Sequence, residues 1–177
     1  MSIITIDPGA GGGIAWRHDE PEQVEVVNMP KGMTAQADLL RSLSAQGFRR
    51  AVIERVGTYQ SGNSGPSAAT FAMHVGAIDA LCYAFGISVE KVTPQKWMKD
   101  LGHSVTRYLP DGYKDMPKGN EKKAARAKAV RENKAAIKEA MARRYPHLCV
   151  TLKTADALGI MTWAEKKANT ENQALMR

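Results

Sequence analysis

Short apolar runs separated by polar turns organise the first third of the chain. β-Branched residues dominate positions 3–6, and a glycine-rich reversal leads to a second apolar run at 14–16, which predicts two strands joined as a hairpin. A third strand is expected to end near Asn28. Residues 34–45 predict a helix, and the apolar run at 51–55 predicts a fourth strand.

The rest of the chain is largely helical in pattern. Residues 67–85 place five apolar side chains on one helix face, at alternating steps of four and three. These are Phe71, Val75, Ile78, Cys82 and Phe85. A strand at 88–92 follows, and helices are expected at 94–101, at 121–145 and after the N-cap residue Thr154. Antiparallel strands followed by strand–helix alternation predict a mixed α/β sheet flanked by helices.

Composition agrees with one globular domain. The 177 residues are 44% hydrophobic, enough to bury one sizeable core, and the mean hydropathy is -0.36. No apolar run of about 18 residues and no signal-peptide pattern occurs, so we expect a cytoplasmic protein without a membrane span. We expect a single domain over residues 1–166 and a polar C-terminal segment, 167–177, that frays. Cys82 and Cys149 both lie in apolar sequence, which argues against a disulfide framework or a zinc site.

Positive charge is concentrated in one segment. The net charge of the chain is +7, and residues 107–144 contain twelve basic and five acidic residues, so the excess in this segment equals that of the whole chain. Such a concentration suits the neutralisation of nucleic-acid phosphates, with a solvated helix face as the alternative. Residues 107–120 contain the prolines and glycines typical of a loop, whereas 121–145 are rich in helix formers.

Three acidic residues stand out because of their surroundings. Asp7 ends the first apolar run, Glu54 lies inside the fourth, and Asp156 falls in the first turn of the last helix. A carboxylate within an apolar run is costly unless it is paired or binds a metal. Each also has a structural explanation: a turn before Pro8 for the first, an edge strand or pairing with Arg55 for the second, and the helix dipole for the third. Their joint occurrence favours a metal site.

With these segments in view, the chain resembles the RuvC-type Holliday junction resolvases of the RNase H-like superfamily, particularly their phage members. The matching pieces are residues 5–9, 52–56, 92–97 and 155–160. They run in order through almost the whole chain. The resemblance implies an RNase H-like mixed five-stranded sheet flanked by helices, in a protein of the bacterial cytoplasm that is phage-encoded. It also implies a homodimer formed through helix 67–85, although an apolar helix face is more often core than interface.

The resemblance further implies an activity and a cofactor. Asp7, Glu54 and Asp156 would be the catalytic and metal-binding residues of an endonuclease that nicks two strands of four-way or otherwise branched DNA. Such sites use two Mg2+ ions, for which Mn2+ can substitute, roughly 3.5 to 4 Å apart. One departure is Lys153, because relatives usually carry an acid or a histidine about one helical turn before the last catalytic acid. Three explanations stay open here: three carboxylates suffice, another acid fills the gap, or the protein binds without cutting.

Contacts with DNA are expected from several parts of the chain. Tyr59, in the polar loop 57–66, is the candidate for stacking on bases at the junction centre, with packing over its own loop as the alternative. Lys153 could contact the scissile phosphate. The expected backbone contacts are Lys96, Lys99, Arg107, Lys114, Lys118, Lys122, Lys123 and Arg126. Two other functions are compatible with the sequence: a nuclease of the same fold acting on flaps or RNA, and a junction-binding protein without catalysis.

Overall fold

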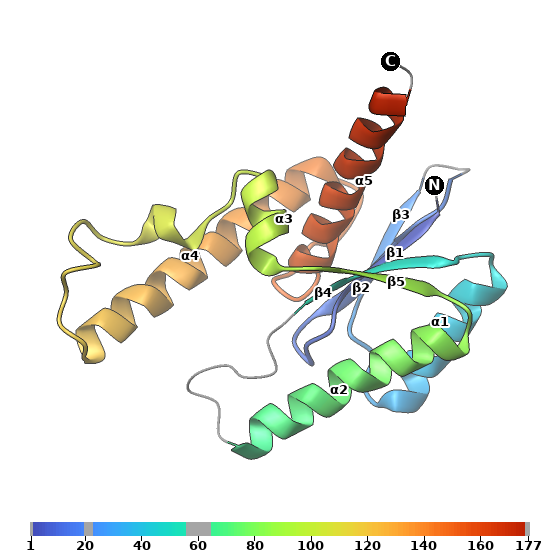
Figure 1. Ribbon diagram of the computed structural model, residues 1–177, viewed down its shortest axis with the longest axis horizontal. Helices are drawn as coiled ribbons and strands as arrows, with labels where there is room; N and C mark the ends of the chain where they lie inside the picture. The colour runs from blue at the N-terminus through green and yellow to red at the C-terminus, as the bar shows by residue number, and fades with distance from the viewer. Residues whose placement is uncertain (1, 20–22, 56–64, 176–177) are drawn as a thin grey trace.

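The computed structural model describes residues 2–19, 23–55 and 65–175 (Figure 1). Its elements, in chain order, are β1 (Ile3–Asp7), β2 (Gly13–Arg17), β3 (Val24–Asn28), α1 (Met33–Ala45), β4 (Arg50–Glu54), α2 (Gly65–Ala84), β5 (Ser88–Val92), α3 (Pro94–Asp100), the 3-10 helix η1 (Val105–Tyr108), α4 (Asn120–Arg144) and α5 (Ala155–Leu175). These boundaries lie within two residues of most of those predicted from the sequence. Among the described residues, no helix has the length and apolar character needed to cross a membrane.

The strands form one mixed sheet in the order β3-β2-β1-β4-β5. β1 runs antiparallel to β2 and parallel to β4, and β4 runs parallel to β5. The register aligns Ile6 of β1 with Ile53 of β4. The next residues along these two strands are Asp7 and Glu54, so two of the three singled-out acids lie side by side at the same end of the sheet.

Side-chain alternation along the strands divides the interior into two cores, one on each face of the sheet. On one face, Ile4 and Ile6 pack with buried residues of α1 and α2. On the other, Ile3 and Val52 pack with buried residues of α4 and α5. Figure 1 shows the corresponding arrangement, with α1 and α2 on one side of the sheet and α5 on the other. Because the period along a strand is two, Asp7 shares the α5 side with Ile3.

The last helix corrects the expectation for residues 167–177. α5 runs without interruption to Leu175, so the polar segment continues the helix instead of fraying from residue 167 onward. Tertiary contacts supply the reason. Lys167 pairs with Glu90 of β5 at 2.6 Å, which holds this part of α5 against the sheet.

The two cysteines differ in their surroundings. Cys82 is buried on α2, as expected, but Cys149 is exposed, so the apolar sequence around it did not predict burial correctly. Cys149 lies in the connection between α4 and α5, where the adjacent Val150 is the residue that is buried.

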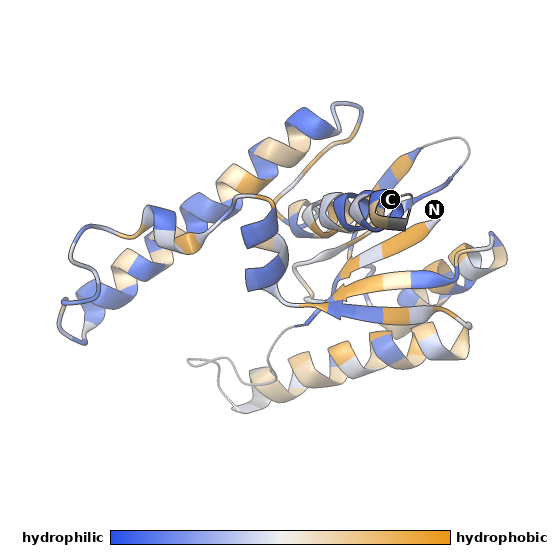
Figure 2. Cartoon of the chain, turned by 45° about the horizontal axis from the view of Figure 1, so that its top comes forward, coloured by the Kyte–Doolittle hydropathy of each residue, from blue (hydrophilic) through white to orange (hydrophobic). Residues whose placement is uncertain are grey.

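The distal half of α4 and the loop before it form an arm that extends away from the sheet (Figure 1). We call residues 105–128 the basic arm. The buried residues of α4 are Ala129, Asn133, Ile137 and Met141, so the helix packs against the domain only beyond the arm. Hydrophilic residues predominate along the loop and the distal end of α4 (Figure 2). Within the arm, the Lys122 ammonium donates to the carbonyls of Lys114 at 2.9 Å and Met116 at 2.8 Å.

Candidate active site

Strand alternation and one buried hydrogen bond bring the three acids to the same side of the sheet. Asp7 and Glu54 end adjacent parallel strands, and both face α5. The hydroxyl of Thr5, which is fully buried, donates to the carbonyl of Ala157 at 2.8 Å. This bond fixes the first turn of α5 on β1, and Asp156 lies in that turn.

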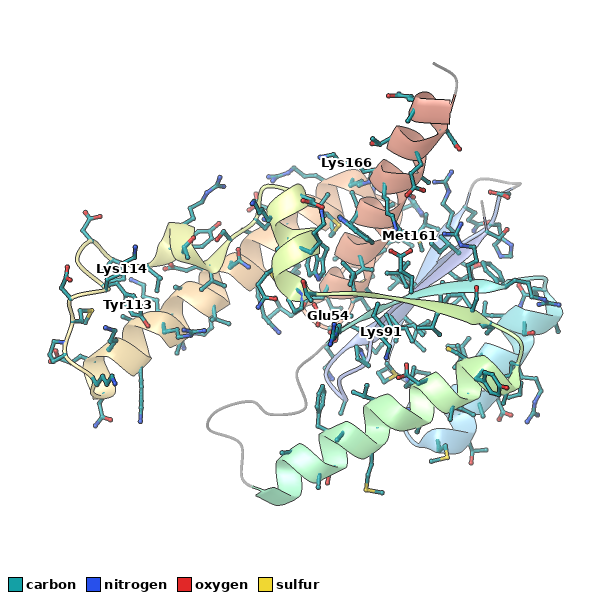
Figure 3. The ribbon with its side chains drawn as sticks, in the orientation of Figure 1. Glu54, Lys91, Tyr113, Lys114, Met161 and Lys166 are labelled. Atoms are coloured by element: carbon teal, nitrogen blue, oxygen red, sulfur yellow. The ribbon has the colours of Figure 1, made fainter. Side chains whose placement is uncertain are left out.

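Glu54 is buried and oriented by a tryptophan. Trp97 of α3 donates its indole N–H to Oε1 of Glu54 at 2.9 Å. The Trp97 ring itself lies against α5 at Gly159, where an added Cβ would stand only 2.7 Å from the ring. Because residue 159 is a glycine, the indole can pack directly against α5. The indole N–H in turn orients the Glu54 carboxylate. Figure 3 shows Glu54 at the end of the sheet, next to α3 and α5.

The turn after β1 leaves room for the carboxylate of Asp7. A Cβ at Gly12 would lie 2.3 Å from the carbonyl oxygen of Asp7 and 2.7 Å from its carboxylate, so no other residue fits there without a shift. The amide of Gly9 donates weakly to Oδ1 of Asp7 at 3.4 Å. Gly13 is also confined, because its Cβ would stand 2.8 Å from the carbonyl oxygen of Val27 and 3.0 Å from that of Lys153 in the turn that precedes α5.

Asp156 has a lysine as its neighbour. Lys134 of α4 places its ammonium 3.8 Å from Oδ2 of Asp156, and its side chain is half exposed. The charge of Lys134 acts on all three carboxyl groups. Thr154 precedes α5 as predicted, but its hydroxyl accepts from the amide of Thr151 at 2.9 Å and stabilises the turn before the helix.

Burial raises the pKa of each of the three acids, and repulsion from a neighbouring carboxylate raises the pKa of Glu54 and Asp7 further. For Glu54, burial first and then the charge of Asp7 raise the pKa to about 8, although the Trp97 N–H and Lys134 oppose the shift. For Asp7, burial and then the charge of Asp156 raise the pKa to about 6. Burial also raises the pKa of Asp156, against the opposing charge of Lys134. The three carboxyl groups therefore interact with one another electrostatically.

This donor set fits a hard divalent cation. Carboxylate oxygens are the protein ligands that Mg2+ prefers, and repulsion between buried carboxylates is relieved when a cation neutralises them. Within residues 2–19, 23–55 and 65–175, however, no three acidic, histidine or cysteine side chains stand close enough to form a ready metal-binding group. Electrostatic interactions between carboxylates act over longer distances than metal–ligand bonds. The three acids are therefore near enough to affect one another's pKa, but their oxygens are not close enough together to bind one ion directly.

The residues expected to contact DNA have different surroundings. Lys153 is exposed, with only its backbone confined by Gly13. Lys99 is exposed on α3, whereas Lys96 pairs with Asp100 at 2.6 Å. Tyr59 lies outside the residues that the structure describes.

The remaining basic candidates belong to the arm. Arg107, Lys114, Lys118, Lys123 and Arg126 are exposed there. Lys122 is the exception, because its ammonium binds two loop carbonyls and lies 5.2 Å from the centre of the Tyr113 ring. Tyr113 and Lys114 lie far out on the arm, away from Glu54 (Figure 3). The exposed arm residues and the largely buried acidic cluster therefore lie in two separate parts of the molecule.

Comparison with known proteins follows from this geometry. No family model and no curated protein matches the sequence. Among solved structures, Thermus thermophilus RuvC matches with a TM-score of 0.53 at 14% identity, over 97% of this chain and 97% of that chain. T. thermophilus RuvC in complex with Holliday junction substrate matches with a TM-score of 0.59 at 15% identity, over 96% of each chain. This chain has the RuvC fold. The predicted mixed five-stranded sheet flanked by helices is thereby confirmed.

Sequence reasoning missed two features of this candidate site. Lys134 was counted among the basic residues of the helix but was not singled out. The helical spacing of α4 could have pointed to Lys134. Asn133 is one of the buried residues of this helix, so the next residue, Lys134, lies at the edge of the surface that faces α5. Trp97 is fully buried, and its bond to Glu54 depends on α3 and β4 meeting in space, which no local sequence pattern indicates.

Proposed function

We propose that this protein is a metal-dependent endonuclease that resolves four-way DNA junctions by paired nicking. The observation that carries the proposal is the gathering of Asp7, Glu54 and Asp156 on one side of the sheet end, within a RuvC fold that spans nearly the whole chain. One matching structure contains RuvC with a Holliday junction substrate, which supports branched DNA as the substrate class.

In this proposal Asp7, Glu54 and Asp156 hold the metal. Mg2+ held by these carboxylates would supply an activated water and electrostatic stabilisation of the leaving oxygen of the phosphodiester. Glu54 is held in orientation by the Trp97 N–H, as metal ligands commonly are by the groups behind them. Lys134, half exposed beside Asp156, is within reach of a phosphate that approaches the carboxylates.

The basic arm supplies the proposed contacts with the DNA backbone. Its exposed lysines and arginines lie outside the acidic cluster, so they can bind the arms of a junction while the cluster acts near the branch point. Phosphate contacts of this kind position the nucleic acid without reading its sequence. The geometry therefore supports recognition of branched shape in preference to sequence.

A symmetric junction requires two active sites, and α2 is the proposed subunit contact. Met73 and Tyr83 are 76% and 88% exposed on this helix, and between them the small residues Gly76 and Ala80 are exposed as well. An exposed apolar stripe of this kind suits a second copy of the chain, with small residues that permit close approach. Analytical ultracentrifugation of the protein and of Tyr83→Asp tests the dimer, which the charge at the stripe should dissociate.

One assay tests the activity. The protein is incubated with Mg2+ and a synthetic four-way junction, a flap, a linear duplex or an RNA/DNA hybrid, and the cut positions are read. Paired symmetric nicks in the junction are expected. Asp7→Asn should abolish cleavage and leave junction binding intact. Cleavage that persists in Asp7→Asn overturns the metal assignment, and preferential cutting of the flap or hybrid favours a nuclease of another specificity.

Lys153 motivates the second candidate, a junction-binding protein without catalysis. It stands where related sites carry an acid or a histidine, and its side chain is exposed. Binding of the junction with no product at any Mg2+ or Mn2+ concentration favours this candidate. The variant Lys153→Asp separates the explanations: a faster reaction means that the missing acid limits turnover, and an unchanged or slower reaction means that Lys153 is itself adapted to its position.

A further inference from the structure

A partly buried hydrogen-bond network connects α2 to the turn that carries Asp7. His74 of α2 bonds through Nδ1 to the carbonyl oxygen of Pro8 at 2.5 Å, and Pro8 directly follows Asp7. Its other ring nitrogen, Nε2, lies 2.7 Å from Nε2 of Gln36 on α1. The same Gln36 nitrogen donates to the carbonyl of Pro30 at 2.9 Å. The network therefore joins α1, α2 and two connecting segments.

Hydrogen-bond chemistry fixes the role of every atom in this network. A carbonyl oxygen only accepts, so Nδ1 of His74 carries the hydrogen that is donated to Pro8. In a neutral ring Nε2 is then an acceptor, and it receives one hydrogen of the Gln36 amide while the other goes to Pro30. Neutral His74 in this single tautomer satisfies all four groups, and a protonated ring would set two N–H groups against each other.

Burial makes the loss of any hydrogen bond in this network costly in free energy. Gln36 is only 2% exposed, and His74 is half-buried between α2 and the Pro8 turn. A buried polar side chain that loses a partner costs the desolvation of the group left behind, so the arrangement is held as a unit. Within that unit, the Pro8 carbonyl is the point of contact with the candidate active site.

We propose that His74 is a positioning residue, which holds the Asp7 turn from α2 and thereby sets the orientation of the Asp7 carboxylate. The backbone of the turn is held by the Gly12 amide, which donates to the carbonyl of Gly9 at 2.8 Å, but the Asp7 carboxylate receives only a weak bond from the Gly9 amide at 3.4 Å. This inference rests on the proposed function, because metal affinity is its readout. It assigns chemistry to a histidine whose sequence surroundings show no metal-ligand spacing.

Two substitutions of His74 each remove a different one of its two hydrogen bonds. In His74→Asn, the side-chain amide nitrogen takes the place of Nδ1 and donates to Pro8, but the side chain is too short to reach Gln36. In His74→Gln, the longer side chain reaches Gln36 and no longer bonds to Pro8. Each variant loses one buried hydrogen bond, so their thermal stabilities should fall by similar amounts. Only the second should disturb Asp7.

The test measures Mg2+ and Mn2+ affinity of the full chain by isothermal titration calorimetry, with circular dichroism melting in parallel. We expect His74→Asn to bind metal within about threefold of the unmodified protein, and His74→Gln to bind roughly 10- to 100-fold more weakly, as for other residues that orient metal ligands. Should His74→Gln not fold, His74→Met replaces it, since it removes the Pro8 bond without burying a polar group.

The outcomes separate this inference from the proposed function. If Asp7→Asn leaves metal affinity unchanged, the proposed metal site itself is wrong. If Asp7→Asn weakens binding but both His74 variants bind like the unmodified protein at equal cost in stability, His74 is structural only and the inference is overturned. Equal weakening in both His74 variants also overturns it, because the Pro8 bond would then not be the contact that matters.

Discussion

Trp97 donates its indole N–H to Glu54 at 2.9 Å while its ring fills the space left by the missing side chain of Gly159. One side chain from α3 thus contacts both β4 and α5. The arrangement explains how an acid within an apolar strand is accommodated: its oxygen has a buried donor, and the donor is held by close packing on the helix that carries Asp156.

Substituting Trp97 by phenylalanine should weaken metal binding. Trp97→Phe retains most of the ring volume but removes the donor, so Glu54 loses its orientation and its pKa rises further. We expect Mg2+ affinity to fall roughly 10- to 100-fold, measured by calorimetry, with a parallel loss of junction cleavage. Trp163→Phe is the matched control, because Trp163 donates to Asp100 at 2.8 Å and not to a site acid. Equal losses in both variants would show a general packing effect.

The glycine turn after Asp7 provides a prediction with an internal control. Gly12→Ala would place a Cβ 2.3 Å from the Asp7 carbonyl and 2.7 Å from its carboxylate, whereas Gly11→Ala meets open space. We expect Gly12→Ala to cost on the order of 1–3 kcal/mol in the free energy of unfolding, as overpacking does, and to impair metal binding. Gly11→Ala should leave both nearly unchanged. Denaturant unfolding and calorimetry measure the two effects, and indistinguishable variants would contradict the close approach at Gly12.

The raised pKa of Glu54 predicts how stability depends on pH. The folded protein retains the Glu54 proton up to about pH 8, whereas an ordinary glutamate releases it near 4.5. The free energy of unfolding of the metal-free protein should therefore fall as pH rises from about 4.5 through 8, by an amount on the order of a few kcal/mol. Asp7 contributes in the same direction up to about pH 6.

Glu54→Gln tests this dependence, because a neutral amide has no proton to lose. Its melting temperature, measured in the presence of a chelator, should fall less than that of the unmodified protein between pH 6 and 9. Glu139→Gln serves as the control, since Glu139 is an exposed partner of Arg143 on α4. A melting curve of Glu54→Gln that follows the unmodified protein over this range would contradict a raised Glu54 pKa.

Lys134 is expected to matter more than other lysines of α4. Its ammonium lies 3.8 Å from Asp156, where it can meet the phosphate that approaches the carboxylates. Lys134→Met should slow junction cleavage by roughly tenfold or more, in line with the loss of a charge-assisted contact. Lys138→Met, one turn further along the exposed face, should have a small effect. Similar cleavage rates in both variants would mean that Lys134 contributes only to the overall positive charge of α4 and makes no specific contact with the phosphate.

The basic arm predicts a strong salt dependence of DNA binding. Removal of one phosphate contact should reduce the slope of log affinity against log salt by about 0.9 for duplex arms. The triple variant of Lys114, Lys118 and Lys123 to glutamine should therefore bind junctions more weakly and with a smaller slope, as measured by fluorescence anisotropy. Lys31→Gln, remote from the arm in sequence and exposed, is the control. An unchanged slope in the triple variant would exclude the arm from DNA contact.

Local sequence signals were sufficient for most secondary structure. The apolar runs, glycine reversals and helix periodicities of this chain correspond to strands and helices within a residue or two of their predicted ends. The errors arose where tertiary contacts act. α5 extends beyond residue 166 because Lys167 pairs with Glu90 of β5, and no local pattern shows that the two meet.

By itself, the sequence determined the strand and helix content, the concentration of positive charge in residues 107–144, and the three acids worth examining. Only the tertiary structure decided which groups surround those acids. Lys134, Trp97 and His74 reach the Asp7–Glu54 region from three different helices. The physical reason is that strand periodicity depends on neighbours along the chain, whereas the partners of a buried charge are set by how distant helices pack on the sheet.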